Sequence, residues 1–204
     1  MAYGTFKTLE EVMIHFDIEG LNDRFIDELH FESSEIMFNF INKNLSNRRN
    51  FISENSICEA VIFPILSIVA DKYDLPLWSH TRFDVAPDEG LSGIPDFLIA
   101  PVSKTGLSFT DPVICIAEVK KENFDEGWTQ AVCEMIAAQR FNASSKKTVY
   151  GIATSGEFWK FGKLTDRTFI MDTRAYSATS DLQQLLNVLS WFFREAKKEL
   201  TRQK

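Results

Sequence analysis

Residues 93–121 read GIPDFLIAPVSKTGLSFTDPVICIAEVKK, and the fold depends on this segment more than on any other. It contains two short apolar runs, each suited to one buried strand, and a polar loop over residues 102–112 that joins them. Charge interrupts each run in one place: Asp96 lies near the start of the first, and Glu118 and Lys120 lie at the end of the second. Buried charge is costly unless it is paired or used, so these three residues mark a candidate site.

Alternate side chains of a strand share one face, so Glu118 and Lys120 are expected to point the same way. If the two strands are antiparallel neighbours, the start of one lies beside the end of the other, which brings Asp96 next to both. Two carboxylates suit a Mg²⁺ or Mn²⁺ ion, and a lysine can contact a phosphate or position the attacking water. The face shared with Glu118 is predicted to hold Ile114, Ile116 and Lys120, and the opposite face Val113, Cys115, Ala117 and Val119.

The pair Pro95-Asp96 followed by Glu118-Val119-Lys120 resembles the PD-(D/E)XK superfamily of restriction-endonuclease-like nucleases. The resemblance implies an α/β fold with a restriction-endonuclease-like core, in which helices flank a mixed central sheet. The superfamily core runs helix, hairpin, third strand, helix and further strand, and residues 53–155 show this order. The resemblance also implies that Asp96 and Glu118, with the carbonyl of Val119, hold Mg²⁺ or Mn²⁺, and that Lys120 orients or activates water.

Two further site residues follow from the same resemblance. Many members carry a glutamate on the first core helix and some carry a glutamine after the lysine, and the matching positions are Glu59 and Gln130. Each has a structural alternative: Ser56 and Glu59 form an S-x-x-E capping-box signature, and Gln130 can be an exposed helix position. The tyrosine that often follows such a glutamine is replaced by Glu134. Asp96 can likewise be a turn residue, and Glu118 and Lys120 a solvated pair.

The 204 residues are 45% hydrophobic, which predicts a single domain over residues 1–204. It is expected to comprise an N-terminal helical addition (1–50), the nuclease-like core (53–176) and a C-terminal packing helix (180–200). Expected helices cover residues 8–17, 33–45, 53–73 (started, kinked or divided by Pro64), 125–142 and 180–200. Expected strands cover residues 77–87, 94–101 and 113–121, with three more within 148–173.

Charge and cysteine usage limit the functional classes. Residues 1–35 carry nine acidic and two basic residues, so the whole net charge of -7 lies there and the remainder is neutral. This balance neither excludes nor supports a nucleic-acid partner. No apolar run reaches membrane-helix length, no secretory signal is visible, and three separated cysteines indicate a reducing cytoplasm. The histidine spacing gives no zinc signature, and His80 is expected to make a local hydrogen bond.

Two functions are compatible with these features. The first is a metal-dependent nuclease, endonuclease or exonuclease, that hydrolyses phosphodiester bonds of DNA or RNA. The alternative is a catalytically silent binding or accessory protein of the same fold, which acts with a protein partner docked on the N-terminal helices. A plain interaction module is a distant third. Dimerisation is common among similar nucleases, so a homodimer stays open.

Overall fold

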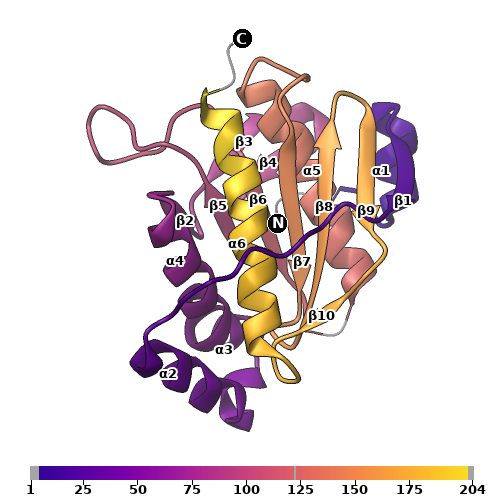
Figure 1. The fold of residues 1–204 in the computed structure, drawn as a ribbon. Helices are drawn as coiled ribbons and strands as arrows, with labels where there is room; N and C mark the ends of the chain where they lie inside the picture. The colour runs from indigo at the N-terminus through magenta and orange to yellow at the C-terminus, as the bar shows by residue number, and fades with distance from the viewer. Residues whose placement is uncertain (1–4, 122, 202–204) are drawn as a thin grey trace.

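The computed structural model describes residues 5–121 and 123–201, and its centre is an eight-stranded mixed sheet (Figure 1). The strands are β1 (Glu19–Asp23), β2 (Leu77–Ser79), β5 (Phe97–Ile99), β6 (Cys115–Val119), β7 (Val149–Thr154), β8 (Phe158–Thr165), β9 (Thr168–Asp172) and β10 (Tyr176–Ser177). Their order is β1-β9-β8-β7-β6-β5-β2, with β10 also paired to β8. The pairs β1–β9 and β6–β7 are parallel and the other pairs are antiparallel.

Helices cover both faces of this sheet, which confirms the predicted α/β class with a mixed central sheet (Figure 1). They are α1 (Leu9–Phe16), α2 (Glu35–Leu45), α3 (Glu54–Ile57), α4 (Phe63–Lys72), α5 (Phe124–Phe141) and α6 (Leu182–Thr201). Short 3-10 turns cover Arg48–Phe51 and Pro87–Glu89, and a separate two-stranded sheet joins β3 (Phe83–Ala86) to β4 (Leu91–Gly93). Within the described residues, no helix is both long enough and apolar enough to cross a bilayer.

Two apolar layers hold the sheet between its helices. On one face, α3, α4 and α6 bury aliphatic and aromatic side chains, with Phe192 and Phe193 of α6 fully buried. On the other face, α5 and α1 form the second layer, in which the ring of Trp128 packs 5.4 Å from that of Phe169. Burial of each such large side chain contributes about 1.5–3 kcal/mol, so the helices hold the strands of the sheet in fixed positions.

The helical segment predicted over residues 53–73 is divided near Pro64. Division was one of the three effects expected of this proline. A π-helical turn over Cys58–Ile62 separates α3 from α4, and Pro64 lies in the first turn of α4. Because proline has no amide proton, it cannot bond the carbonyl of Ala60 four residues earlier. Asn44 supplies the missing donor, with its Nδ2 2.8 Å from that carbonyl. The π turn therefore follows from the proline, and it begins at Cys58.

The single strand predicted over residues 77–87 is wrong, because the chain breaks at His80. This residue has φ of 49°, in the left-handed region that strands do not use. The segment before it pairs with β5 as β2, whereas the segment after it pairs with β4 as β3 in the smaller sheet. His80 therefore lies at a sharp bend beside the start of β5, where its amide donates to the carbonyl of Asp96 at 3.0 Å.

The N-terminal segment contributes a strand as well as helices. β1 pairs in parallel with β9 at the sheet edge, a strand that the sequence pattern did not predict. All five of its residues are exposed, and four of them are polar or small, with Leu21 as the exception. The segment therefore lacks the alternation of apolar residues that predicts a strand. After β1 the chain runs across α6 toward α2 (Figure 1), and the amides of Phe25 and Ile26 donate to the carboxylate of Asp172.

Candidate active site

Asp96 and Glu118 meet across the antiparallel strands β5 and β6. The register pairs Phe97 of β5 with Ala117 of β6. Asp96, which precedes Phe97, therefore lies opposite Glu118, which follows Ala117. The amide of Asp96 donates to Oε1 of Glu118 at 3.3 Å, and the amide of Val119 donates to Oδ2 of Asp96 at 2.8 Å. Each carboxylate thus accepts from a backbone amide of the other strand segment, and the two charges are close enough to affect one another.

Lys120 extends beyond β6 and joins the same group. Its amide donates to the carbonyl of Thr154 at 2.9 Å, which continues the ladder with β7. Its side chain lies against α5 at Gly127, where an added Cβ would stand 3.3 Å from Lys120 Cγ. Its Nζ is 3.8 Å from Oε2 of Glu54, and only 16% of the side chain is exposed. A glycine in the first turn of α5 therefore makes room for the lysine beside the acids.

The pKa values of the two carboxyls are raised mainly by burial. Burial, together with repulsion from Asp96, raises the pKa of Glu118 to about 8. Burial also raises the pKa of Asp96, although the Val119 amide, His80 and Lys120 partly oppose the shift. A divalent cation would favour the ionised form of both acids, and carboxylate oxygens are the ligands that Mg²⁺ and Mn²⁺ prefer. The donor set therefore fits the ion that the resemblance implies.

A third buried acid, Glu134 on α5, completes the group and was not predicted as a site residue. It is 1% exposed, and a side-chain hydrogen bond joins its carboxyl to that of Glu118. Burial and the nearby Glu118 raise the pKa of Glu134 well above its ordinary value. Its Oε2 and the Oε1 of Gln130, one turn earlier, are buried with no hydrogen-bond partner among the described residues. Two such oxygens suit a site that holds ordered water or an ion.

The sequence carries one signal for Glu134. It stands four residues after Gln130, so the two side chains are predicted to share one face of the helix. On sequence alone, it is only a departure from the tyrosine of the nucleases that the motif resembles. The exposed-helix alternative for Gln130 is wrong, because its side chain is half-buried and its amide oxygen is enclosed.

Glu59 lies on the rim of the site and not among the acids. It is exposed, and among the described residues it makes no hydrogen bond or ion pair with Asp96 or Glu118. The capping-box alternative is also wrong, because Ser53 is the N-cap and accepts from the amide of Ser56 at 3.2 Å. Since the helix begins before Ser56, Glu54 is the helix glutamate that approaches Lys120.

The predicted alternation holds along β6 and fails just before it. Ala117 and Val119 pack with the α4 and α6 layer, whereas Ile116 packs with the α5 layer. Ile114 lies in the α6 layer and Val113 in the α5 layer, the reverse of the prediction, because the regular strand begins only at Cys115.

The alternatives in which the site charges are merely solvated are also wrong. Glu118 is 3% exposed and Lys120 is largely covered, so they are not a surface pair. Asp96 does precede β5 in a loop, but its side chain is committed to the Val119 amide rather than to a turn of its own.

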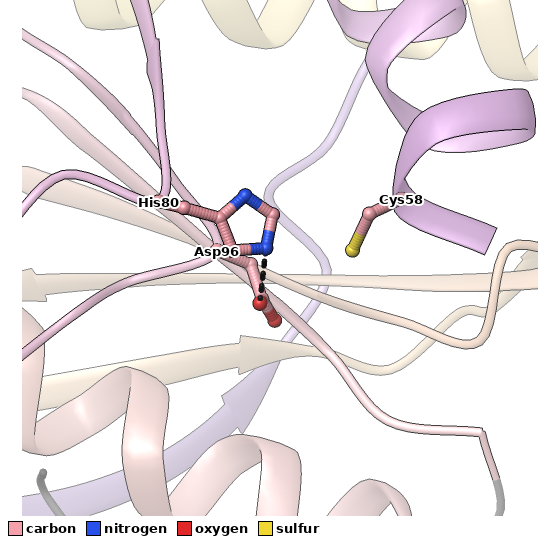
Figure 2. Close-up of side chains that lie close together, drawn as sticks. All are labelled: Cys58, His80 and Asp96. Carbon is pink, nitrogen blue, oxygen red and sulfur yellow. Dashed lines mark ion pairs between the residues drawn. The ribbon is translucent and has the colours of Figure 1, made fainter. Parts of the chain in front are cut away.

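A second group of side chains shares Asp96 (Figure 2). Ligand atoms of Cys58, His80 and Asp96 all lie within 4.8 Å of one another, and His80 Nε2 is 3.4 Å from Asp96 Oδ1. Burial raises the pKa of the Cys58 thiol to about 12. The expected local hydrogen bond of His80 is confirmed, because its Nδ1 lies 2.8 Å from Oγ of Ser79. The proximity of Cys58 to His80 had no sequence signal, since 22 positions separate them.

Comparisons with known proteins give structural similarity but no sequence match. No protein-family model and no curated protein sequence matches the chain. Among solved structures, the type IIG restriction endonuclease BpuSI is similar to 71% of this chain at 16% identity, with a TM-score of 0.41. The chain spans 16% of the length of that enzyme. The geometry of the side chains is therefore the basis on which a function is assigned.

Proposed function

We propose that this protein is a metal-dependent nuclease that hydrolyses phosphodiester bonds of DNA, or of RNA. The observation that supports the proposal most strongly is the meeting of Asp96, Glu118 and Lys120 at the end of two paired strands. Nothing in folding requires two buried acids to be neighbours, since their repulsion and burial destabilise the ionised form. A site that binds a divalent cation explains why they are placed together.

Each residue has a role in this proposal. Asp96 and Glu118 hold Mg²⁺ or Mn²⁺, with the carbonyl of Val119 as a third ligand. When bound, the ion polarises the scissile phosphate and lowers the pKa of a water molecule. Lys120, positioned by Glu54 and by the contact with Gly127, orients the attacking water and stabilises negative charge on the phosphate.

The unpartnered oxygens of Gln130 and Glu134 support a role in holding water close to these acids. Glu59, on the rim of the same region, is available to a second ion or to its bound water. These contributions are secondary, so substitution of Glu59 is expected to weaken cleavage less than substitution of Asp96.

The proposal is tested by cleavage of plasmid and oligonucleotide substrates in Mg²⁺. The Lys120→Ala variant is expected to lose about 100-fold or more of the rate, as when a charge-stabilising group is removed from an active site. Lys121→Ala is the matched control, because this exposed lysine is the next residue and is expected to retain activity. Equal cutting by the native chain and Lys120→Ala would exclude the mechanism.

The alternative, a silent accessory protein, also has an observation in its favour. With a pKa of about 8, Glu118 binds a proton at neutral pH, and residues 36–204 carry no net positive charge to attract nucleic acid. Calorimetric titration with Mg²⁺ separates the two functions. The nuclease should bind the ion in the native chain and lose it in Asp96→Asn, whereas the accessory protein should show no such difference. The three unpaired thiols also favour a reducing compartment, which we propose is the cytoplasm.

A further inference from the structure

The Cys58, His80 and Asp96 cluster brings together three different ligand types from three separate segments. Cys58 opens the π turn before α4, His80 stands at the bend after β2, and Asp96 precedes β5. Among the His, Cys, Asp and Glu residues that the structure describes, these three have ligand atoms that all lie within 4.8 Å of one another, and no other set of three does. The sulfur of Cys58 points toward the imidazole and the carboxylate (Figure 2).

The imidazole of His80 is held in one orientation. Its Nδ1 can donate to Oγ of Ser79, which leaves Nε2, 3.4 Å from Asp96 Oδ1, as the ring nitrogen that can bind a metal ion. Its ring also packs edge-on against Phe97, with centroids 5.9 Å apart. A histidine ligand typically donates its other ring nitrogen in this way, which fixes the tautomer and the direction of the metal bond. The left-handed φ of His80 is the local strain that turns the ring toward the cluster.

A small cavity adjoins the cluster and gives access from solvent. Its volume is about 250 Å³, and Cys58, His80, Phe97 and Glu59 line it. His80 is 44% exposed at this opening, whereas Cys58 is buried at its inner end. Since Cys58 and His80 line this open cavity, an ion held by them and Asp96 would keep a coordination position for water, as in zinc sites with three protein ligands.

We propose that Cys58, His80 and Asp96 form a zinc site that is distinct in ligand chemistry from the magnesium site but shares Asp96 with it. Thiolate, imidazole and carboxylate together suit Zn²⁺, whereas Mg²⁺ takes oxygen ligands almost alone. When the ion binds, the Cys58 thiol loses its proton to solvent and the sulfur becomes a ligand. The site needs no oxidant or further reactant.

The shared aspartate has a functional consequence, which rests on the proposed nuclease function. Asp96 belongs to both proposed ligand sets, so its carboxylate moves toward the site that holds an ion. Zn²⁺ held by Cys58 and His80 withdraws Asp96 from Glu118, so zinc inhibits magnesium-dependent cleavage. Removal of the thiol should relieve this inhibition without removing any magnesium ligand.

Binding is tested with cobalt and zinc alone, independently of nuclease activity. Co²⁺ added to the native protein is expected to give a thiolate-to-cobalt charge-transfer absorption, which Zn²⁺ displaces at one equivalent. Cys58→Ala should abolish the band, whereas Cys133→Ala, at another buried helical cysteine, should retain it. Ser79→Ala is expected to weaken zinc binding about 10–100-fold through the lost support of His80. Circular dichroism confirms that each variant is folded.

Two results would overturn the zinc site: a native protein with no charge-transfer band, or a folded Cys58→Ala variant that binds zinc as tightly as the native chain. Inhibition is then measured in Mg²⁺ with rising Zn²⁺, and Cys58→Ala should need at least 10 times more zinc for the same effect. Zinc binding with no cleavage in any condition would reject the nuclease and leave the zinc site standing. Cleavage that zinc binding leaves unchanged would reject the shared ligand.

Discussion

Substitution of Glu118 by glutamine is expected to stabilise the protein while it removes the proposed metal site. An acid whose pKa is higher in the folded state than in the unfolded state binds more protons when folded. The free energy of unfolding is therefore greatest below the unfolded pKa and falls as the pH rises toward the folded pKa. For Glu118 these limits are 4.5 and about 8.

The size of this effect follows from the pH interval. Stability falls by about 1.4 kcal/mol for each pH unit between the two pKa values, so the loss at pH 7 is roughly 3 kcal/mol. Glutamine stays neutral and avoids this loss, although it can weaken the hydrogen bond with Glu134. Glu118→Gln should therefore exceed the native chain by about 2–3 kcal/mol at pH 7 and differ little at pH 4.

Urea denaturation with a chelator present, repeated between pH 4 and pH 8, measures this difference. Glu32→Gln, at an exposed glutamate, is the matched control and should follow the native curve. Added Mg²⁺ should stabilise the native chain and have a much smaller effect on Glu118→Gln, because the variant lacks one of the two carboxylates proposed to hold the ion. A Glu118→Gln variant that is less stable than the native chain at pH 7, or a difference that does not change with pH, would show that burial of this carboxyl does not destabilise the fold.

Two other substitutions test the scaffold around the site. Asn142→Ala should lower the free energy of unfolding by about 2–4 kcal/mol in urea melts, because its amide group bonds both the N–H and the carbonyl of Val113 in the core. A loss below about 1 kcal/mol would show that water replaces both bonds. Asn44→Ala should cost about 1–3 kcal/mol, since the Ala60 carbonyl loses its donor. The cost should shrink when Pro64 is also alanine, whose amide can bond that carbonyl; equal costs in both backgrounds would contradict this explanation.

The sequence predicted the centre of the site because strand periodicity and antiparallel pairing are local rules. Asp96 and Glu118 were expected to meet if the two apolar runs formed antiparallel neighbours, and β5 and β6 pair in this way. The same rules cannot place a helix residue against a strand. Glu54 approaches Lys120 because of where the helix begins and how the π turn at Cys58 shifts its register.

Other features depend on the whole fold. His80 reads as part of a strand, and only its left-handed backbone reveals the bend that brings it to Asp96. β1 has no apolar pattern because it is an exposed edge strand, and its extended conformation depends on backbone pairing with β9. Glu134 reads as a helix-surface acid until the packing of α5 on the sheet shows that it is buried.

The crossing of the N-terminal segment over α6 has a consequence for synthesis of the protein. β1 pairs with β9, Leu29 bonds the carbonyl of Asn187, and the carbonyl of Phe31 accepts from Gln183. The partners of this early segment are therefore about 150 residues later in the chain. During synthesis the segment leaves the ribosome before its partners have been made. Contacts at such separations slow folding, so newly made chains should spend a vulnerable interval as targets for chaperones and proteases.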